Sequence, residues 1–263
     1  MNMRRSKTLE LLRKGKTVFS VKINSTDPRA TEIASMMGFP CIWVDLEHTA
    51  NDYSVLESQI YAAKAYDTDI LTRVPRGSYS DYIRPLELDA AGIMVPHIMS
   101  VEDAKSVVHM TRFYPLGRRP VDGGNADAKY CNMDQAEYNR QANDQRFLIF
   151  QIEDPEAMEQ IEEIAKVPGY DMLFFGPGDF SHGIGHSGDM NHPEVRKGFE
   201  KVAAAAKKYG KFAGTVGSVD NAGERTDMGY QFLNIGSDVV ALGKYFKGLA
   251  GFVEKFAESN KNL

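Results

Sequence analysis

The chain has 263 residues and a formal charge of −5, from 31 lysines and arginines against 36 aspartates and glutamates. No basic cluster interrupts this acidic balance, so we expect no nucleic-acid partner, because such partners require lysine and arginine against their phosphates. The sequence has no run of 18 apolar residues and no recognisable secretory signal, so we expect no membrane partner and a cytoplasmic location.

The first half of the chain repeats a strand pattern followed by a helix pattern. A short amphipathic helix with Leu9, Leu11 and Leu12 comes first and is expected to plug one end of a barrel. Short apolar runs then indicate strands at 17–23, 41–46, 69–74 and 93–95. Helices are expected after them, at 29–37, from Asn51 or Asp52 to 66, at 79–88 and at 100–111.

An irregular stretch follows at residues 113–143 and contains the segments P-L-G-R-R-P and D-G-G-N-A-D. Loops of this length in a compact domain are usually functional or form an interface. We therefore expect an irregular loop that covers the mouth of the active site.

The second half continues the same alternation. Strands are indicated at 147–152, 172–175, 211–215 and 232–235, and helices at 155–167, 192–209, 219–228 and 238–256. Eight strand-helix units can be counted, and no linker or low-complexity segment divides them. The length also suits one α/β barrel, for which roughly 250 residues is typical. The sequence therefore predicts a single (β/α)8 TIM barrel over residues 1–263.

Polar residues stand where several of the predicted strands end. In an α/β barrel the carboxyl ends of all strands converge on one face, where catalytic groups gather. The residues at these ends are Asp45, Glu47, His48, Arg73, Gln151, Glu153 and Asp179. Because buried charges are costly unless they are paired or bind a metal, a shared site explains this set better than core packing does.

Two of these acids, Glu153 and Asp179, are candidate ligands of a divalent metal. Glu153 closes one strand and Asp179 lies in a Gly-Pro-Gly turn just past the next, so both carboxylates reach the same end of neighbouring strands. An acid after a strand is also often a helix cap, and Asp154 before Pro155 fits that interpretation. The two carboxylates alone leave metal binding and capping equally open.

Several other residues also have a structural interpretation. Arg73 could form an ion pair with Asp45 or Glu47, and Glu47 itself is expected to be structural. His48 is interpreted as catalytic rather than as a core histidine, whereas His97 is assigned a structural role because no motif accompanies it.

The remaining motifs are weak. His182 and His186 have the spacing of zinc ligands, but the glycines between them argue against a helix and predict a mobile loop. Glycines at 214–217 and 236 leave a phosphorylated substrate as a minor alternative. Cys41 and Cys131 lie far apart without metal-ligand spacing, so neither a disulfide framework nor a zinc site is indicated.

Five motifs together resemble one known family. They are D-L-E-H at 45–48, R-V-P at 73–75, L-D-A-A-G-I-M-V-P at 88–96, Q-I-E at 151–153 and G-P-G-D-F-S at 176–181. This order is similar to that of the HpcH/HpaI family of class II pyruvate aldolases, which includes 4-hydroxy-2-oxoheptanedioate and 2-dehydro-3-deoxyglucarate aldolases. The resemblance covers about residues 15–245.

The resemblance implies a metal-dependent reaction. A 4-hydroxy-2-oxo acid would be cleaved reversibly to pyruvate and an aldehyde through a metal-stabilised enolate. Glu153 and Asp179 would bind Mg²⁺, Mn²⁺ or Co²⁺, which suits an all-oxygen site. Gln151 would line the metal-bound water or substrate, and backbone amides near Gly178 and Asp179 would hold the pyruvate carboxylate.

The resemblance also implies the groups that stabilise charge and move protons. Arg73 would stabilise the enolate with its fixed positive charge. His48, oriented by Asp45, would be the acid and base of the reaction. At 113–120 this chain has F-Y-P-L-G-R-R-P, which departs from the family's usual motif after Arg119, so the aldehyde pocket is expected to differ.

Relatives in this family assemble as hexamers or trimers of dimers, with the last helix exchanged between subunits. The resemblance therefore implies a homo-oligomer, and the apolar segment G-L-A-G-F-V-E-K-F is compatible with such an exchange.

Two alternatives to the aldolase stay open. One is a lyase acting on a CoA thioester, like the citrate lyase β-subunit and malyl-CoA lyase, although no basic nucleotide site is seen. The other is a catalytically silent barrel that binds a metabolite. A class I aldolase is not indicated, because no lysine stands at the ends of the second to sixth strands.

Overall fold

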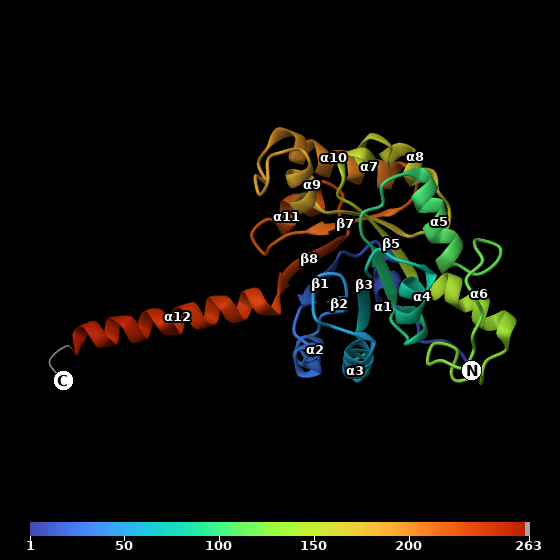
Figure 1. The fold of residues 1–263 in the computed structure, drawn as a ribbon, viewed down its shortest axis with the longest axis horizontal. Helices are drawn as coiled ribbons and strands as arrows, with labels where there is room; N and C mark the ends of the chain where they lie inside the picture. The colour runs from blue at the N-terminus through green and yellow to red at the C-terminus, as the bar shows by residue number, and fades with distance from the viewer. Residues whose placement is uncertain (261–263) are drawn as a thin grey trace.

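The sheet is built from eight strands: β1 (Val18–Ile23), β2 (Cys41–Asp45), β3 (Asp69–Arg73), β4 (Gly92–Val95), β5 (Phe147–Ile152), β6 (Met172–Phe175), β7 (Phe212–Val216) and β8 (Phe232–Ser237). Each strand pairs in parallel with its sequence neighbours, and β8 pairs with β1 to close the barrel. This computed structural model describes residues 1–260 (Figure 1). The closed sheet confirms the predicted (β/α)8 class. The single domain over 1–263 stays a prediction, and its residues 261–263 lie outside the described part.

Helices precede, connect and follow the strands: α1 (Lys7–Arg13), α2 (Pro28–Met36), α3 (Tyr53–Lys64), α4 (Tyr79–Glu87), α5 (Val101–Thr111), α6 (Gln135–Gln145), α7 (Pro155–Glu159), α8 (Ile161–Lys166), α9 (Pro177–Gly183), α10 (Pro193–Lys208), α11 (Ala222–Asp227) and α12 (Asp238–Ser259). Most predicted helices are confirmed. The single helix expected at 155–167 is wrong, because Gln160 leaves helical geometry at φ −103°, ψ 11° and divides it into α7 and α8.

The continuous apolar runs of the strands follow from burial on both faces of the sheet. Alternate residues point into the barrel, where a buried cluster includes Val18, Cys41, Trp43, Leu71, Met94, Phe147, Ile149, Met172, Phe174 and Phe232. The residues between them face the helices, where Val95, Phe150 and Phe175 form a second cluster with helix residues such as Phe199 and Val202 of α10. The barrel interior is therefore packed with side chains, and polar residues are left for its carboxyl end.

Helix α1 closes the amino end of the barrel, as predicted. Leu9 and Leu12 are buried in the interior cluster. The segment before them is held by Asp69, which is fully buried at the start of β3. Asp69 accepts hydrogen bonds from the Ser6 hydroxyl and the Thr8 backbone N–H, both at 2.8 Å, and pairs with Arg4 at 2.7 Å.

The connection at 113–143 differs from its prediction in two ways. Its last part is helical, since α6 begins at Gln135. Its side chains pack at the amino end of the barrel: Phe113 and Tyr138 share a buried cluster with Met3, and Arg119 pairs with Asp127 at 3.1 Å. A connection from a helix to the next strand must lie at that end, because β5 starts there. The expectation that this segment covers the active-site mouth of its own chain is therefore wrong.

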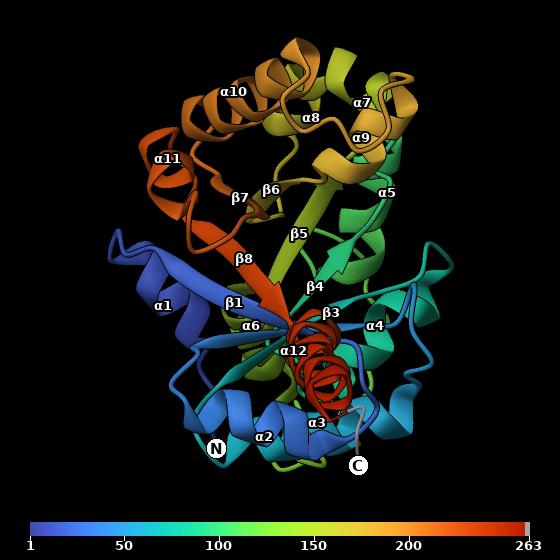
Figure 2. The same ribbon diagram turned by 90° about the vertical axis from the view of Figure 1, so that its left-hand side faces the viewer.

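Helix α12 leaves the barrel and extends away from it (Figure 1), and Figure 2 shows it nearly end-on in front of the sheet. None of its residues is buried. Many of its exposed apolar residues follow one another at spacings of three or four, as Leu242, Phe246, Leu249, Val253 and Phe256 do, and Tyr245 and Phe252 lie beside them. This spacing gives the helix one apolar face. Among residues 1–260, no helix is both long enough and apolar enough to cross a membrane.

Replacing Asp69 by alanine should lower the free energy of unfolding by about 3 kcal/mol, because Arg4 and two further donors lose a buried partner. Urea unfolding followed by circular dichroism measures this loss. The control is Asp144→Ala, which removes the exposed ion pair with Arg13 at the same end and should cost less than about 0.5 kcal/mol. Equal losses in the two variants would contradict the role given to Asp69.

Candidate active site

The carboxyl ends of β1, β2 and β3 place three charged side chains inside the barrel. Asp45 and Arg73 are the last residues of their strands and lie directly opposite each other in the parallel register. Lys22 alternates with the buried Val18 and Ser20 along β1 and so points the same way. The sequence analysis identified Asp45 and Arg73 but missed Lys22, although the period of two along β1 could have revealed it.

Asp45 forms ion pairs with both Arg73 and Lys22. The Nε and Nη2 groups of Arg73 donate to its two carboxylate oxygens at 2.9 and 2.5 Å, and Lys22 Nζ lies 2.6 Å from Oδ2. Burial alone would raise the pKa of Asp45, but hydrogen bonds and charge from Arg73 and Lys22 outweigh it and lower the pKa to about 2. Asp45 is therefore a permanent anion that fixes the Arg73 guanidinium in a two-point pair.

His48 does not pair with Asp45, and the expected orientation by that residue is wrong in this structure. Its Nε2 atom lies 3.4 Å from Glu47 Oε2, and its side chain is 61% exposed. The carboxylate of Asp45 is occupied by Arg73, Lys22 and the Glu47 backbone N–H at 3.0 Å, so no position is left for the imidazole. Glu47 thus links His48 to Arg73, whose Nε lies 3.1 Å from it.

Glu153, just past the end of β5, is an almost completely buried acid, with 1% of its surface exposed. One carboxylate oxygen accepts the His97 backbone N–H at 3.0 Å, and the other accepts the Gln151 side-chain amide. Burial is the main cause that raises the pKa of Glu153, and the charge of Asp179 adds to it; against the opposing effects of His97 and Arg73, the pKa rises to about 7. Desolvation of the carboxylate is thus only partly compensated by its neighbours.

Gly176 leaves the space that the Glu153 side chain occupies. A Cβ atom at this position would lie 2.6 Å from the Glu153 Oε2 atom and 2.9 Å from its Cβ, closer than side chains pack. Asp179 follows in the first turn of α9, whose first residue is Pro177. The predicted Gly-Pro-Gly turn is therefore the start of a helix, which proline at the first position favours. Gly178 and Asp179 are both exposed there.

His97 belongs to this group, although the sequence analysis gave it only a structural role. Its ring nitrogens lie 3.0 Å from Asp154, 3.6 Å from Glu153 and 3.9 Å from Glu47. Burial lowers the pKa of His97, but its hydrogen bond with Asp154 and the nearby carboxylates raise it above its usual value. The position after β4 was its only sequence signal.

His182 and His186 do not form a zinc site. The segment is helical up to Gly183, contrary to the expected loop, but His186 lies beyond the helix and its ring stacks on His192 instead. Within residues 1–260, no three histidine, cysteine, aspartate or glutamate side chains form a cluster suited to a metal. Cys41 is buried and Cys131 exposed, and both are free thiols.

The residues around Glu153 nevertheless fit a divalent cation. The Gln151 side-chain oxygen is buried and has no hydrogen-bond partner among residues 1–260, while its amide nitrogen contacts Glu153. Together with Asp179 this gives only oxygen donors, which hard cations prefer. Ionisation of Glu153 beside Asp179 is costly, and a positive charge here would instead favour the ionised form.

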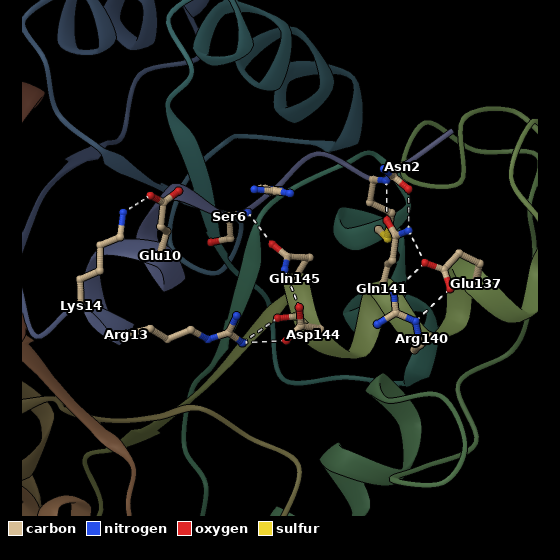
Figure 3. A pocket seen from close by; sticks show the side chains of 12 residues that line it. Asn2, Ser6, Glu10, Arg13, Lys14, Glu137, Arg140, Gln141, Asp144 and Gln145 are labelled. Carbon is tan, nitrogen blue, oxygen red and sulfur yellow. Dashed lines mark hydrogen bonds and ion pairs between the residues drawn. The ribbon is translucent and has the colours of Figure 1, made fainter.

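One cavity lies elsewhere. It has a volume of about 710 Å³ and opens between the N-terminal segment, α1 and α6, at the amino end of the barrel (Figure 3). Its charged residues are mostly exposed and already paired, as Arg13 is with Asp144 and Arg140 with Glu137. We therefore place the candidate active site at the carboxyl ends of the strands and not in this cavity.

Known proteins resemble the chain along most of its length. Residues 19–243 match the family model described as HpcH/HpaI aldolase/citrate lyase. A hydroxypyruvate/pyruvate aldolase of Pseudomonas aeruginosa is 31% identical, covering 91% of this chain and 90% of the relative. A 5-keto-4-deoxy-D-glucarate aldolase of Klebsiella pneumoniae is 31% identical over 81% of this chain and 83% of the relative. The crystal structure of an HpcH/HpaI aldolase from Desulfitobacterium hafniense is 30% identical, with a TM-score of 0.87 over 95% of this chain and 96% of that one.

Glu153→Gln should stabilise the metal-free protein at alkaline pH. A pKa raised to about 7 means that protonation of the folded state stabilises it below about pH 4.5 and that this contribution is lost as the pH rises through 7. Glutamine cannot ionise, so its advantage over wild type should grow across that range to about 3 kcal/mol. Urea unfolding of both proteins in EDTA at pH 5 and about pH 8.5 measures the difference. A difference that does not change with pH would contradict the raised pKa.

Proposed function

Because the chain belongs to the HpcH/HpaI aldolase/citrate lyase family, we propose a division of labour among its own residues. Relatives 31% identical over most of the chain are aldolases, so it is a carbon–carbon lyase that cleaves a hydroxy-2-oxo acid to pyruvate and an aldehyde. The observation that carries the proposal is the buried Glu153 carboxylate, which lies beside a Gln151 oxygen that has no partner in the described part of the chain.

Glu153 and Asp179 would hold the divalent cation on which this class of aldolase depends, and Mg²⁺, Mn²⁺ and Co²⁺ all suit their oxygen donors. When bound, the cation supplies Lewis-acid stabilisation of the negative charge that develops on the 2-oxo group. Gln151 would orient water or substrate through its buried side-chain oxygen. The backbone amides at Gly178 and Asp179, in the first turn of α9, would bind the substrate carboxylate.

Arg73 would stabilise the same developing charge. The Nε and Nη2 groups of Arg73 donate to Asp45, and within residues 1–260 the Arg73 Nη1 group makes no hydrogen bond. A guanidinium fixed in this way keeps one N–H group available for an oxygen of the substrate. Its ion pair with Asp45 is thus both structural and functional, since it orients the free group. Lys22 would support this arrangement by holding Asp45 from the other side.

His48 would transfer the proton between the C4 hydroxyl of the substrate and solvent. Its ring is exposed to solvent, and Glu47, at 3.4 Å, would set its orientation. Breaking the C3–C4 bond then releases the aldehyde, and protonation at C3 completes pyruvate. This assignment keeps the predicted role of His48 and replaces Asp45 by Glu47 as its partner.

A second copy of this chain would complete the fold. Helix α12 buries none of its residues, while a groove of about 370 Å³ remains on the outside of the barrel, lined by Phe19 of β1, Ile235 of β8 and the 37–40 segment. In a closed barrel the helix after the last strand normally covers this face. Exchange of α12 between subunits of a homo-oligomer, either a hexamer or a trimer of dimers, would cover both the apolar face of α12 and the groove. A cytoplasmic location stays a prediction.

The first test is pyruvate release from a panel of 4-hydroxy-2-oxo acids, coupled to lactate dehydrogenase, with EDTA and after addition of Mg²⁺, Mn²⁺ or Co²⁺. EDTA should abolish release and metal should restore it. Glu153→Ala should lower the rate at least about 100-fold, because it removes a ligand of the cation. Glu156→Ala changes an exposed acid nearby and should leave the rate unchanged.

The outcomes of this test separate the alternatives. Metal binding by calorimetry without release from any substrate would favour the thioester lyase or a silent metabolite-binding barrel. Failure to bind any of the three metals would refute the proposed site.

Light scattering should show a homo-oligomer. Phe252→Asp with Phe256→Asp should reduce its mass while the circular dichroism of the barrel persists, because both side chains lie on the exposed apolar face of α12. Lys255→Glu changes the charge of the same turn outside that face and should leave the mass unchanged. A monomeric wild-type protein would contradict the exchange.

A further inference from the structure

His97, which follows Pro96 after β4, has an unusual backbone conformation, with φ at 50°. This left-handed region is uncommon for residues other than glycine, and among those residues asparagine, aspartate and histidine adopt it most often. Such a conformation persists only where the surrounding structure fixes it, and it is found preferentially at functional sites. At His97 it turns the backbone N–H inward, onto a carboxylate oxygen of Glu153 at 3.0 Å.

The backbone on the other side of His97 is fixed as well. Its carbonyl oxygen accepts a hydrogen bond from Arg76, which is itself paired with Asp103 at 2.8 Å. The N–H of Met99 donates to the same aspartate at 3.1 Å. Asp103 therefore ties together the guanidinium and the chain that follows His97.

The segment is also attached to β5. The Ile98 N–H donates to the backbone oxygen of Gln151 at 3.3 Å, and the Gln151 side chain donates to the second oxygen of Glu153. The His97 ring lies between Asp154 and Glu47, at 3.0 and 3.9 Å. These contacts hold both the ring and the backbone of His97 in place.

We propose that His97 is a positioning residue for Glu153: its left-handed backbone presents the N–H that fixes the carboxylate in the orientation needed for a divalent cation. A carboxylate that accepts one hydrogen bond on each oxygen cannot rotate, and its remaining lone pairs keep a defined direction. Partners of this kind typically change metal affinity 10- to 100-fold when they are lost. This inference rests on the proposed function, in which Glu153 is a metal ligand.

The backbone conformation gives a way to test the inference without touching Glu153. Asparagine tolerates the left-handed region and keeps a polar side chain beside Asp154, so His97→Asn should preserve the direction of the N–H. Valine is strongly disfavoured there because its Cβ is branched. His97→Val should therefore turn the N–H away from Glu153 while the chain on either side stays anchored.

The experiment measures the affinity of wild type and both variants for Mn²⁺ alone by isothermal titration calorimetry, at one alkaline pH. His97→Val should bind about 10- to 100-fold more weakly than wild type, and His97→Asn within about threefold of it. Thermal unfolding in EDTA establishes that each variant is folded. If the valine variant does not fold, His97→Ala replaces it, since alanine carries a smaller cost in the same region.

Each outcome has one meaning. Equal affinity in all three proteins would overturn the inference, because the backbone of His97 would then not matter to the cation. An equal loss in both variants would also overturn it, since the imidazole rather than the N–H would be responsible. No Mn²⁺ binding by wild type would instead refute the proposed metal site. Weak binding confined to the valine or alanine variant is the expected result.

Discussion

Burial of the Glu153 carboxylate is the constraint that its surroundings satisfy. An acid inside a barrel is disfavoured in its ionised form, and each neighbour reduces that cost in a different way. Gly176 leaves room where any side chain would collide, Gln151 donates to one oxygen, and His97 donates to the other from a backbone held in a rare conformation. Together these contacts keep a costly group in one orientation, which is the arrangement a metal ligand requires.

The part of the site around Asp45 depends on ion pairs between buried charges. Asp45 is fully buried between two cations, and the two-point pair with Arg73 leaves the guanidinium oriented with one group free. Strand register produces this pair, because Asp45 and Arg73 end adjacent strands at the same height. The charges of the site are thus arranged by the sheet, while His48 and Glu47 lie on the loop that follows β2 and take their positions from it.

The sequence was sufficient to predict the barrel and most strand ends, because continuous apolar runs and the alternation of strand and helix patterns are local signals. It was insufficient where loop geometry decides. The D-L-E-H motif does not tell which carboxylate contacts His48, and Pro96-His97 gives no sign of a left-handed backbone. The length of the 113–143 segment does not tell at which end of the barrel it lies; its position between α5 and β5 does. Lys22 stands within an apolar strand and has no motif beside it, so only the alternation along β1 shows that it faces the site.

The exposed helix α12 has a consequence for how stability depends on conditions. A helix that buries none of its residues against its own barrel gains little from the folding of that chain alone. In an assembly that covers its apolar face, folding and association become one equilibrium governed by mass action. The melting temperature then rises with protein concentration, and dilution removes stabilisation without changing any covalent bond or any contact inside the barrel.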